Sequence, residues 1–293
     1  MDIQTYLSEK KKLIDAGLEA ILSSEEMPVQ RLEDGVRHAV FPGGKRIRPI
    51  LVIASCEAVG GDCAQIVPIA CCVELVHSYS LVHDDLPAMD NSDLRRGLPT
   101  VHKIVGEGIA VLVGDELLTL AFQTLVGLDG IHDVKRTRLI RELASACGTA
   151  GLIGGQALDL EAEQKQVEKT SVEEIARRKT GALIEASVGM GAIAGDASGE
   201  DLARLKKCGA SVGLAFQIMD DLLDAEGEEE TLGKPVRCDQ EKGKATYPSA
   251  FGAKRSRELA QQLTEEAVGL LADLGEKAQP LREIARLLLK RKG

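Results

Sequence analysis

Long segments with the periodicity of helices fill most of this chain, and they restrict its fold more than any other feature. Apolar residues recur at helical spacing over residues 66–83, 108–128, 172–195 and 200–223, and again over 254–290. No series of short alternating strands separates these segments. Apolar residues at this spacing are typical of helices that pack against one another. The sequence therefore predicts an all-α protein.

The composition agrees with a core made of packed helices. The 293 residues include no Trp, four Phe and three Tyr, so Leu, Ile, Val and Ala must fill the interior. These aliphatic residues suit helix–helix packing. The length would allow two domains. Because no linker or repeat of fixed period is visible, we expect a single domain over residues 1–293.

The charge and the cysteines exclude several classes of protein. A net charge of −10 and few aromatic residues argue against nucleic acid as a partner. We see no apolar run as long as a membrane span and no secretory apolar region near the start. Seven cysteines without a CxxC pair are typical of free thiols in a reducing cytoplasm, where we expect the protein. The five histidines form no zinc motif.

An acidic cluster ends the apolar segment 200–223. Its members Gln217, Asp220, Asp221 and Asp224 stand at positions i, i+3, i+4 and i+7, so they share one face of a helix. Like charges at this spacing repel one another unless a cation lies between them. Carboxylate oxygens suit Mg²⁺, which completes its coordination with water and phosphate. The cluster therefore predicts a divalent cation.

A second acidic cluster, HDDLPAMD at residues 83–90, ends the segment 66–83. Asp84 and Asp90 would lie on different sides of a straight helix. Pro87 disfavours helical geometry at Leu86, so the helix should end near Asp85. We expect the chain to turn there and to bring Asp90 back toward Asp84. One acidic cluster alone is usually a solvated surface, but two in apolar surroundings favour a metal site.

Cations flank both clusters, as a site for a phosphorylated substrate requires. The stretch GGKRIRP at residues 43–49 combines glycines, which let backbone amides approach an anion, with Lys and Arg side chains. Arg95 and Arg96 follow the first cluster, and Gly233-Lys234 and Lys244 follow the second. The pattern is not a Walker A motif, because GxxxxGK[ST] is absent.

With these motifs the chain resembles the trans-type polyprenyl diphosphate synthases. GGKRIRP, DDLPAMDNSDLRRG, GGQALDL, RKTGALI, FQIMDDLLD and TLGK…KATYP occur here in that family's order, from about residue 35 to 250. The first cluster has the longer DDxxxxD form of the bacterial short-chain farnesyl diphosphate synthases. The resemblance implies a single large helical bundle of the isoprenoid synthase type with a central cavity, acting as a homodimer. Arg237 departs from it, since the family usually has glycine there, which leaves the local loop conformation in question.

The resemblance also implies a mechanism and a set of site residues. Three Mg²⁺ ions, or Mn²⁺ in their place, would stabilise the leaving diphosphate of an allylic substrate, and isopentenyl diphosphate would attack the resulting cation. The implied metal ligands are Asp84, Asp90 and Asp220, with Asp85, Asp221 and Asp224 as direct or water-mediated supports. Arg95, Lys179 and Lys244 would hold the allylic diphosphate, while Thr180, Gln217 and the Lys179 carbonyl would face the cation. Lys45, Arg48, His77 and Arg96 would hold isopentenyl diphosphate, and Gly44 and Lys234 are further substrate-binding residues.

Product length would be set by the helix that leads into the first cluster. One helical turn rises about 5.4 Å, close to the length of one isoprene unit. Ser80 lies four residues before Asp84 and is too small to block a chain, whereas Tyr79 is large enough. In the resembled family an aromatic residue here marks farnesyl producers, so we expect farnesyl diphosphate from dimethylallyl and geranyl diphosphate.

Three other functions remain as alternatives. A geranylgeranyl diphosphate synthase would share every motif except the aromatic floor. A terpene cyclase would share the first cluster, but it has no need of a second diphosphate site and usually carries a different second metal motif. A non-catalytic subunit of a heteromeric synthase would have no reason to keep both clusters. One assay of products from isopentenyl and dimethylallyl diphosphate separates these functions.

Overall fold

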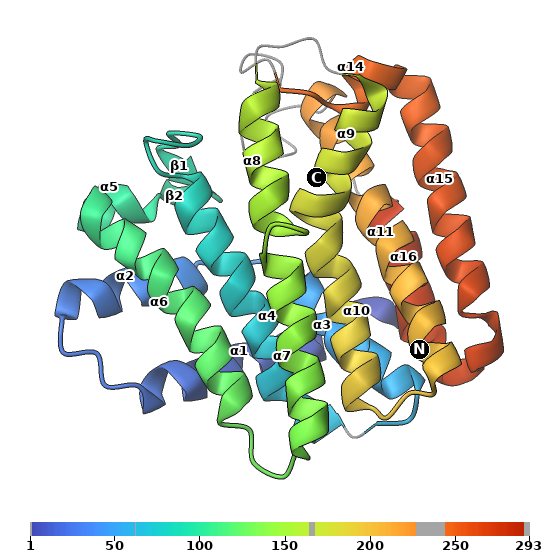
Figure 1. Ribbon diagram of the computed structural model, residues 1–293, viewed down its shortest axis with the longest axis horizontal. Helices are drawn as coiled ribbons and strands as arrows, with labels where there is room; N and C mark the ends of the chain where they lie inside the picture. Colours follow the sequence, from blue (N-terminus) through green and yellow to red (C-terminus); the bar gives the residue numbers. More distant parts are fainter. Residues whose placement is uncertain (1, 62, 164–167, 227–243, 290–293) are drawn as a thin grey trace. The chain divides into compact units, whose positions relative to one another are not determined.

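The computed structural model describes residues 2–61, 63–163, 168–226 and 244–289, and these are mostly helical (Figure 1). They form two compact units, Met1–Ile53 with Cys63–Ile140, and Ala54–Asp62 with Arg141–Gly293. The strands among the described residues are a two-residue antiparallel pair, β1 (Leu94–Arg95) and β2 (Leu98–Pro99). The prediction of an all-α protein is confirmed.

The first unit is built around a buried central helix. Its elements are α1 (Ile3–Ser24), α2 (Gln30–Val40), the first half of α3 (Ile47–Ala58), α4 (Cys63–Asp84), the pair β1–β2, α5 (Val101–Val105), α6 (Glu107–Val126) and the start of α7 (Asp133–Cys147). Helix α4 packs along α6, and α1 lies against α4. Val73, Leu75 and Val76 of α4 are completely buried, as the apolar segment 66–83 predicts.

The second unit is organised around the long helix α11. Its elements are the second half of α3, the second half of α7, α8 (Leu152–Ala162), α9 (Lys169–Ala176), the π-helix η1 (Arg177–Gly181), α10 (Ala182–Ala194), α11 (Gly199–Glu226), α14 (Tyr247–Phe251), α15 (Ala253–Leu270), two 3₁₀ turns η2 (Ala272–Leu274) and η3 (Glu276–Ala278), and α16 (Gln279–Leu289). Helices α10 and α15 both pack on α11. Ile218 and Leu222 of α11 form one core cluster with Tyr247 of α14 and Ala260 of α15.

The last periodic segment is not one helix. Helix α15 ends at Leu270, and α16 begins at Gln279 after the two 3₁₀ turns. Gly275 lies between these turns with φ +64, a backbone conformation that favours glycine. The apolar spacing over 254–290 persists across the break, so periodicity alone could not locate it.

Two helices correct the expectation that no apolar run is as long as a membrane span. Ile66–Asp84 of α4 and Glu107–Val126 of α6 are long and apolar enough by length and composition. The share of each window that is buried is 72% for α4 and 39% for α6. Buried core helices can also be long and apolar enough to meet these criteria, and the α4 window is mostly buried.

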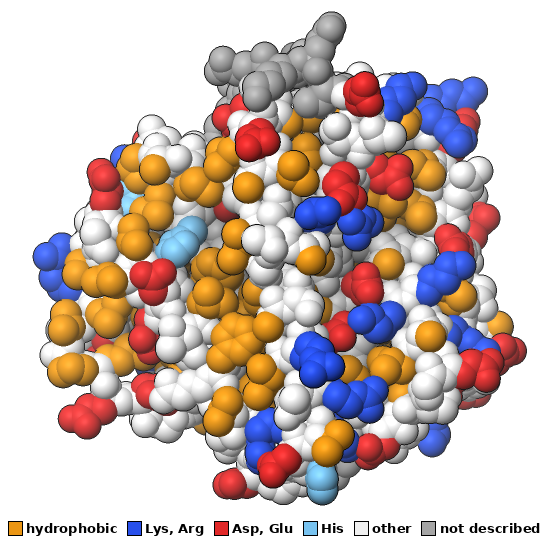
Figure 2. All heavy atoms as spheres, in the orientation of Figure 1, with side chains coloured by type: hydrophobic (Ala, Val, Ile, Leu, Met, Phe, Trp, Pro, Cys, Tyr) orange, Lys and Arg blue, Asp and Glu red, His pale blue; other side chains and the backbone are white. Residues whose placement is uncertain are grey.

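The exposed side of α6 carries several large apolar side chains. Val111 and Leu112 are 41% and 51% exposed, and Ile104 of α5 is 47% exposed. Hydrophobic side chains gather over α5 and α6 in the space-filling view (Figure 2). The cysteines whose side chains are described, at positions 56, 71, 72, 147 and 208, are buried and form no disulfide with one another, which agrees with the expected thiols.

Candidate active site

The first acidic cluster lies where α4 ends and the chain turns. Helix α4 ends at Asp84, and the Asp90 backbone N–H then donates to the Asp84 carbonyl at 2.8 Å. The Asn91 N–H donates to the Leu86 carbonyl at 3.0 Å and closes the same turn. The predicted return of Asp90 toward Asp84 is therefore confirmed. Both carboxyl side chains are half-buried.

The second aspartate of this cluster is held by an arginine of β1. Asp85 is only 3% exposed, and Arg95 binds both of its oxygens, with Nε to Oδ2 at 2.7 Å and Nη2 to Oδ1 at 2.8 Å. Such a bidentate pair is strong and directional. Burial opposes the charge of Arg95, but the hydrogen bond to Asp85 and the nearby Asp84 and Asp90 raise its pKa. Asp85 thus fixes Arg95 beside the other two carboxylates.

The second acidic cluster lies in the last turns of α11. The Thr180 hydroxyl donates to Gln217 Oε1 at 2.5 Å, and Gln217 Nε2 donates to Asp221 Oδ1 at 2.6 Å. Asp221 Oδ2 accepts the Tyr247 backbone N–H at 2.9 Å. The predicted common face of α11 is confirmed by the contact between Gln217 and Asp221, one turn apart. Asp220 is half-buried, whereas Asp221 and Asp224 are each 6% exposed.

A polar cleft opens beside this cluster in the second unit. It encloses about 90 Å³, and its charged lining residues are Asp159, Lys179, Asp221 and Lys244. Lys179 Nζ donates to Asp159 Oδ2 at 2.6 Å. Asp159 and the buried Gln156, whose Oε1 has no hydrogen-bond partner among the described residues, both come from the GGQALDL stretch. The sequence analysis assigned no role to Gln156 or Asp159. The signal for them was two polar residues one helical turn apart in an apolar segment.

Lys179 and Thr180 belong to the π-helix η1. A π turn widens the helix by one residue and is often found at functional sites. Glycines from two neighbouring helices allow close contact with its backbone: a Cβ on Gly155 of α8 would lie 2.2 Å from Lys179 N, and one on Gly213 of α11 would lie 2.8 Å from Gly181 Cα. The π turn is therefore enclosed by helix backbones that approach without side chains.

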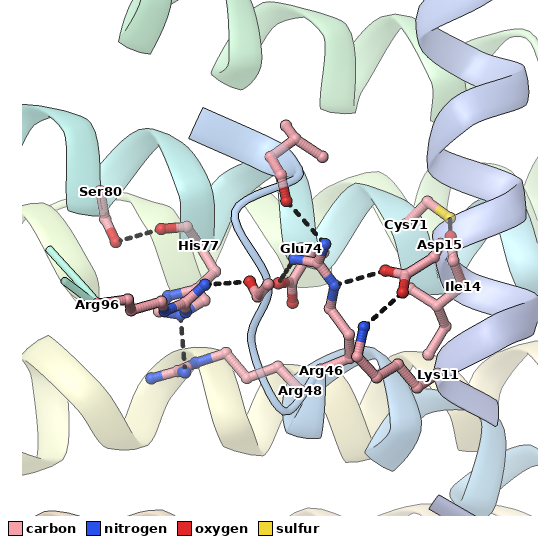
Figure 3. A network of polar contacts seen from close by, with 12 residues as sticks. Lys11, Ile14, Asp15, Arg46, Arg48, Cys71, Glu74, His77, Ser80 and Arg96 are labelled. Atoms are coloured by element: carbon pink, nitrogen blue, oxygen red, sulfur yellow. Dashed lines mark hydrogen bonds and ion pairs between the residues drawn. The ribbon is translucent and has the colours of Figure 1, made fainter. Parts of the chain in front are cut away.

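In the first unit the predicted cations gather around the loop that precedes α3 (Figure 3). Arg48 Nη1 lies 3.4 Å from His77 Nε2, and Arg96 donates to the Gly43 carbonyl. Gly44 has φ +133, and a Cβ there would lie 2.7 Å from Arg96 Nη1. Lys45 is exposed. The loop thus brings Arg48, Arg96 and His77 together, as the resemblance implies.

His77 is neutral in this setting. Burial lowers its pKa well below the ordinary value, and the charges of Arg48, Arg96 and Arg95 lower it further. A neutral imidazole can both donate and accept a hydrogen bond. The ring is therefore a polar, uncharged member of a cationic cluster.

The proposed floor residue Tyr79 is packed in the first unit. It is 5% exposed, and its ring meets that of His83 edge to face, with centroids 5.5 Å apart. His83 Nε2 lies 3.0 Å from the Val111 carbonyl of α6. Ser80 donates to the His77 carbonyl at 2.8 Å, so its hydroxyl is used within α4.

Within the described part of the chain, no three His, Cys, Asp or Glu side chains form a group that could hold a metal by themselves. Lys234 and Arg237 lie outside the described residues, so their predicted roles stay predictions.

Comparison with known proteins identifies the family. The polyprenyl synthetase family model matches residues 29–284. The chain is 44% identical over 260 residues to a farnesyl diphosphate synthase of Geobacillus stearothermophilus, covering 88% of this chain and 87% of that protein. It is 40% identical over 291 residues to a farnesyl diphosphate synthase of Bacillus subtilis, covering 99% and 98%. A solved geranylgeranyl pyrophosphate synthetase of Pyrococcus horikoshii superposes with a TM-score of 0.90 at 34% identity, covering 99% and 98%. This all-α chain, with its two aspartate clusters and their flanking cations, belongs to the polyprenyl synthetase family.

Proposed function

We propose that this prenyltransferase condenses isopentenyl diphosphate with dimethylallyl and then geranyl diphosphate to give farnesyl diphosphate. The observation that carries the proposal is the turn that returns Asp90 to Asp84 beside the Asp85–Arg95 pair, since it gathers carboxylates and a fixed cation as a metal-bound diphosphate requires. The names of the bacterial relatives support the farnesyl product.

Divalent metal fits this donor set. Asp84, Asp90 and Asp220 are half-buried carboxylates, so their oxygens are the ones best suited to hold Mg²⁺. Asp85, Asp221 and Asp224 are buried, and we assign them mainly to positioning. When bound, Mg²⁺ ions, three by family resemblance, neutralise the charge that develops on a departing diphosphate. Mn²⁺ would satisfy the same oxygen ligands.

The chain's own cations would bind the allylic diphosphate. Arg95 is fixed by Asp85, and Lys179 and Lys244 both line the cleft of the second unit. Lys179 is paired with Asp159, so a diphosphate would compete with that carboxylate for the ammonium group. Lys234, outside the described residues, is the remaining candidate.

Oxygen dipoles would stabilise the allylic cation once the bond to the diphosphate breaks. The Thr180 hydroxyl donates to Gln217 Oε1, so the hydroxyl oxygen keeps its lone pairs for a positive charge. The Lys179 carbonyl lies in the π turn, where the ordinary helical bonding pattern is changed. The isopentenyl double bond attacks this cation, and the released pyrophosphate takes the proton.

Isopentenyl diphosphate would bind at the loop that precedes α3. Gly44 lets the backbone approach, Lys45 and Arg48 supply charge, and Arg96 adds a second guanidinium. His77 is a neutral donor at the side of Arg48. A charge-assisted hydrogen bond contributes about 1.5–3 kcal/mol, so each cation should matter for this substrate.

Product length tests the proposal most directly. Purified protein is incubated with isopentenyl diphosphate, dimethylallyl diphosphate and Mg²⁺, and the dephosphorylated products are separated by chromatography. Farnesol supports the proposal, and geranylgeraniol would instead favour the function named for the Pyrococcus relative. A cyclic hydrocarbon would identify a cyclase, and absence of product would favour a non-catalytic subunit.

Tyr79 links the structure to this result. Because its buried ring is braced by His83, Tyr79→Ala should open space beneath the metal site and lengthen the product toward twenty carbons. Tyr79→Phe keeps the ring and serves as the control, which should still stop at fifteen carbons. An active Tyr79→Ala that also stops at fifteen would show that Tyr79 is not the floor.

We also propose that the protein acts as a cytoplasmic homodimer. The exposed Val111 and Leu112 of α6 are the support for this, because a soluble protein usually covers an apolar patch of this kind. Light scattering of the purified protein tests the dimer.

A further inference from the structure

One arginine of the GGKRIRP stretch points away from its neighbours. Arg46 stands between Lys45 and Arg48, yet it is only 3% exposed, whereas Lys45 is exposed and Arg48 is half-buried. In Figure 3, Arg48, His77 and Arg96 lie on one side of the loop, and Arg46 extends toward Asp15 on the other. Arg46 is therefore not available to a diphosphate.

Its guanidinium is bound by three different parts of the first unit. Arg46 Nη1 donates to Glu74 Oε1 of α4 at 2.6 Å, and Nε donates to Asp15 Oδ1 of α1 at 2.9 Å. Nη2 donates to the Val40 carbonyl at the end of α2, at 2.7 Å. A planar fork of donors can make these contacts at once, whereas an ammonium group on a flexible chain cannot reproduce them.

The backbone at Arg46 has an unfavourable conformation that the three hydrogen bonds of its side chain can stabilise. Arg46 has φ +50, and Gly43 and Gly44 have φ +93 and +133. Left-handed backbone is unfavourable for a residue with a Cβ and persists where surrounding contacts hold it. The contacts of the Arg46 side chain therefore hold the backbone of residues 43–46, which carries Lys45 and leads into Arg48 of α3.

The partners of Arg46 are themselves firmly placed. Glu74 is 3% exposed, and it stands one helical turn before His77 on α4. Asp15 also accepts from Lys11 at 2.5 Å. Helix α1 is seated closely on α4, since a Cβ on Gly17 would lie 2.6 Å from Val67 Cγ1. The two carboxylates also offset part of the positive charge that Arg46, Arg48 and Arg96 concentrate here.

We propose that Arg46, Glu74 and Asp15 are positioning residues, a clamp that fixes the loop 43–46 and the start of α3 so that Lys45 and Arg48 can bind isopentenyl diphosphate. The inference rests on the proposed function of that loop. Helix α1 carries none of the assigned ligands. Through Asp15 it would nevertheless help to set the affinity for isopentenyl diphosphate.

Three variants test the clamp, and one serves as its control. Arg46→Lys keeps the charge and loses the fork, Glu74→Gln keeps the shape and loses the charge, and Asp15→Asn weakens the link to α1. The control is Arg37→Lys, because Arg37 also binds a carboxylate of α1, Glu19 at 2.5 Å, but its side chain is 37% exposed, against 2% for that of Arg46. For each variant KM is measured separately for isopentenyl and geranyl diphosphate.

Arg46→Lys and Glu74→Gln should raise KM for isopentenyl diphosphate about tenfold, the loss expected when one good contact is removed. Asp15→Asn should raise it about threefold, since Asp15 is more exposed than Glu74. KM for geranyl diphosphate and both constants of Arg37→Lys should stay within about twofold. Calorimetric titration with isopentenyl diphosphate alone, which cannot react, should repeat the same ratios.

The clamp is refuted if both KM values rise equally, or if only kcat falls in proportion to the folded fraction measured by circular dichroism. Unchanged KM in Arg46→Lys and Glu74→Gln would refute it as well. Failure of the proposed function is distinguishable, because the wild type would then form no prenyl product. Titration of wild type and variants with inorganic pyrophosphate would in that case still decide whether the clamp sets anion affinity.

Discussion

The two aspartate clusters present the same residue types from different local structures. The first spans the end of α4 and a tight turn, whereas the second lies within the last turns of the continuous helix α11. In both, the second aspartate of the pair is buried and bonded to the protein, Asp85 to Arg95 and Asp221 to Gln217 and the Tyr247 N–H. The half-buried Asp84 and Asp220 that precede them are better suited to hold a cation.

The hydrogen-bond donors that hold the two buried aspartates differ in charge. Asp85 is held by a charged guanidinium, whereas Gln217 and the Tyr247 backbone offer neutral N–H groups to Asp221. Carboxylates near a helix C-terminus are disfavoured by the helix dipole, so each cluster needs such donors. We therefore expect each paired-aspartate motif to contain one residue that faces the cation and one that anchors the motif.

The largest expected effect separates the two residues of each pair. Asp84→Ala and Asp220→Ala should lower turnover roughly a hundredfold or more, because they remove charge stabilisation of the leaving group. Asp85→Asn and Asp221→Asn, which keep an acceptor oxygen, should lose less. Steady-state rates with and without excess EDTA test this. Full activity in EDTA, or equal losses for both members of a pair, would contradict the division.

A smaller effect should separate the cations of the two units. Lys45→Ala and Arg96→Ala should mainly raise KM for isopentenyl diphosphate, and Lys244→Ala should mainly raise KM for the allylic substrate. Loss of one charge-assisted contact predicts a change of roughly tenfold or more. The two constants are measured by varying each substrate against saturation of the other. If every variant changed both constants alike, the assignment of cations to substrates would be wrong.

The anchoring role of Asp221 should appear in stability without any substrate. Asp221→Ala leaves the buried Tyr247 N–H without this acceptor, which costs about 1–3 kcal/mol. Asp85→Ala should cost less, because the Arg95 side chain is 36% exposed and water can replace its partner. Urea unfolding in EDTA gives both values. A reversed order would mean that the charged pair is the stronger anchor.

The smallest effect concerns pH. Since the pKa of folded His77 is depressed, the unfolded chain binds this proton first as the pH falls below the ordinary value of 6.5. Stability should be unaffected above that pH and should fall between 6.5 and the depressed folded pKa, by at most roughly 1.4 kcal/mol per pH unit. His77→Gln should lose less stability than wild type between pH 7.5 and 5.5 in urea unfolding. Parallel curves would show that His77 does not titrate in this way.

Many helices and several site contacts could be predicted from the sequence because they depend on residues that are close together in the chain. Apolar spacing predicted α4, α6 and α11, Pro87 predicted the end of α4, and the i, i+4 spacing of Gln217 and Asp221 predicted their contact. The roles of Asp159 and Glu74 could not be found this way, since each depends on a partner about 20 or more residues distant. A single acidic residue in a helix carries no sign of the arginine or lysine that will bind it.

The π turn at Arg177–Gly181 also has a consequence for the register of the chain. Each residue of an α-helix advances the direction of its side chain by about 100°, so the additional residue in a π turn rotates everything that follows it. An uninterrupted α-helix would place the buried Val172 of α9 and the buried Leu183 of α10 within about 20° of each other, and the additional residue separates their directions. Deletion of a single residue in this turn would restore ordinary helical pitch and rotate the buried helix α10 by about 100° against α11, on which it packs. The segment that carries Lys179 and Thr180 thus also sets the rotation of α10 relative to α9. Its length therefore cannot change without disturbing the packing of one of these helices.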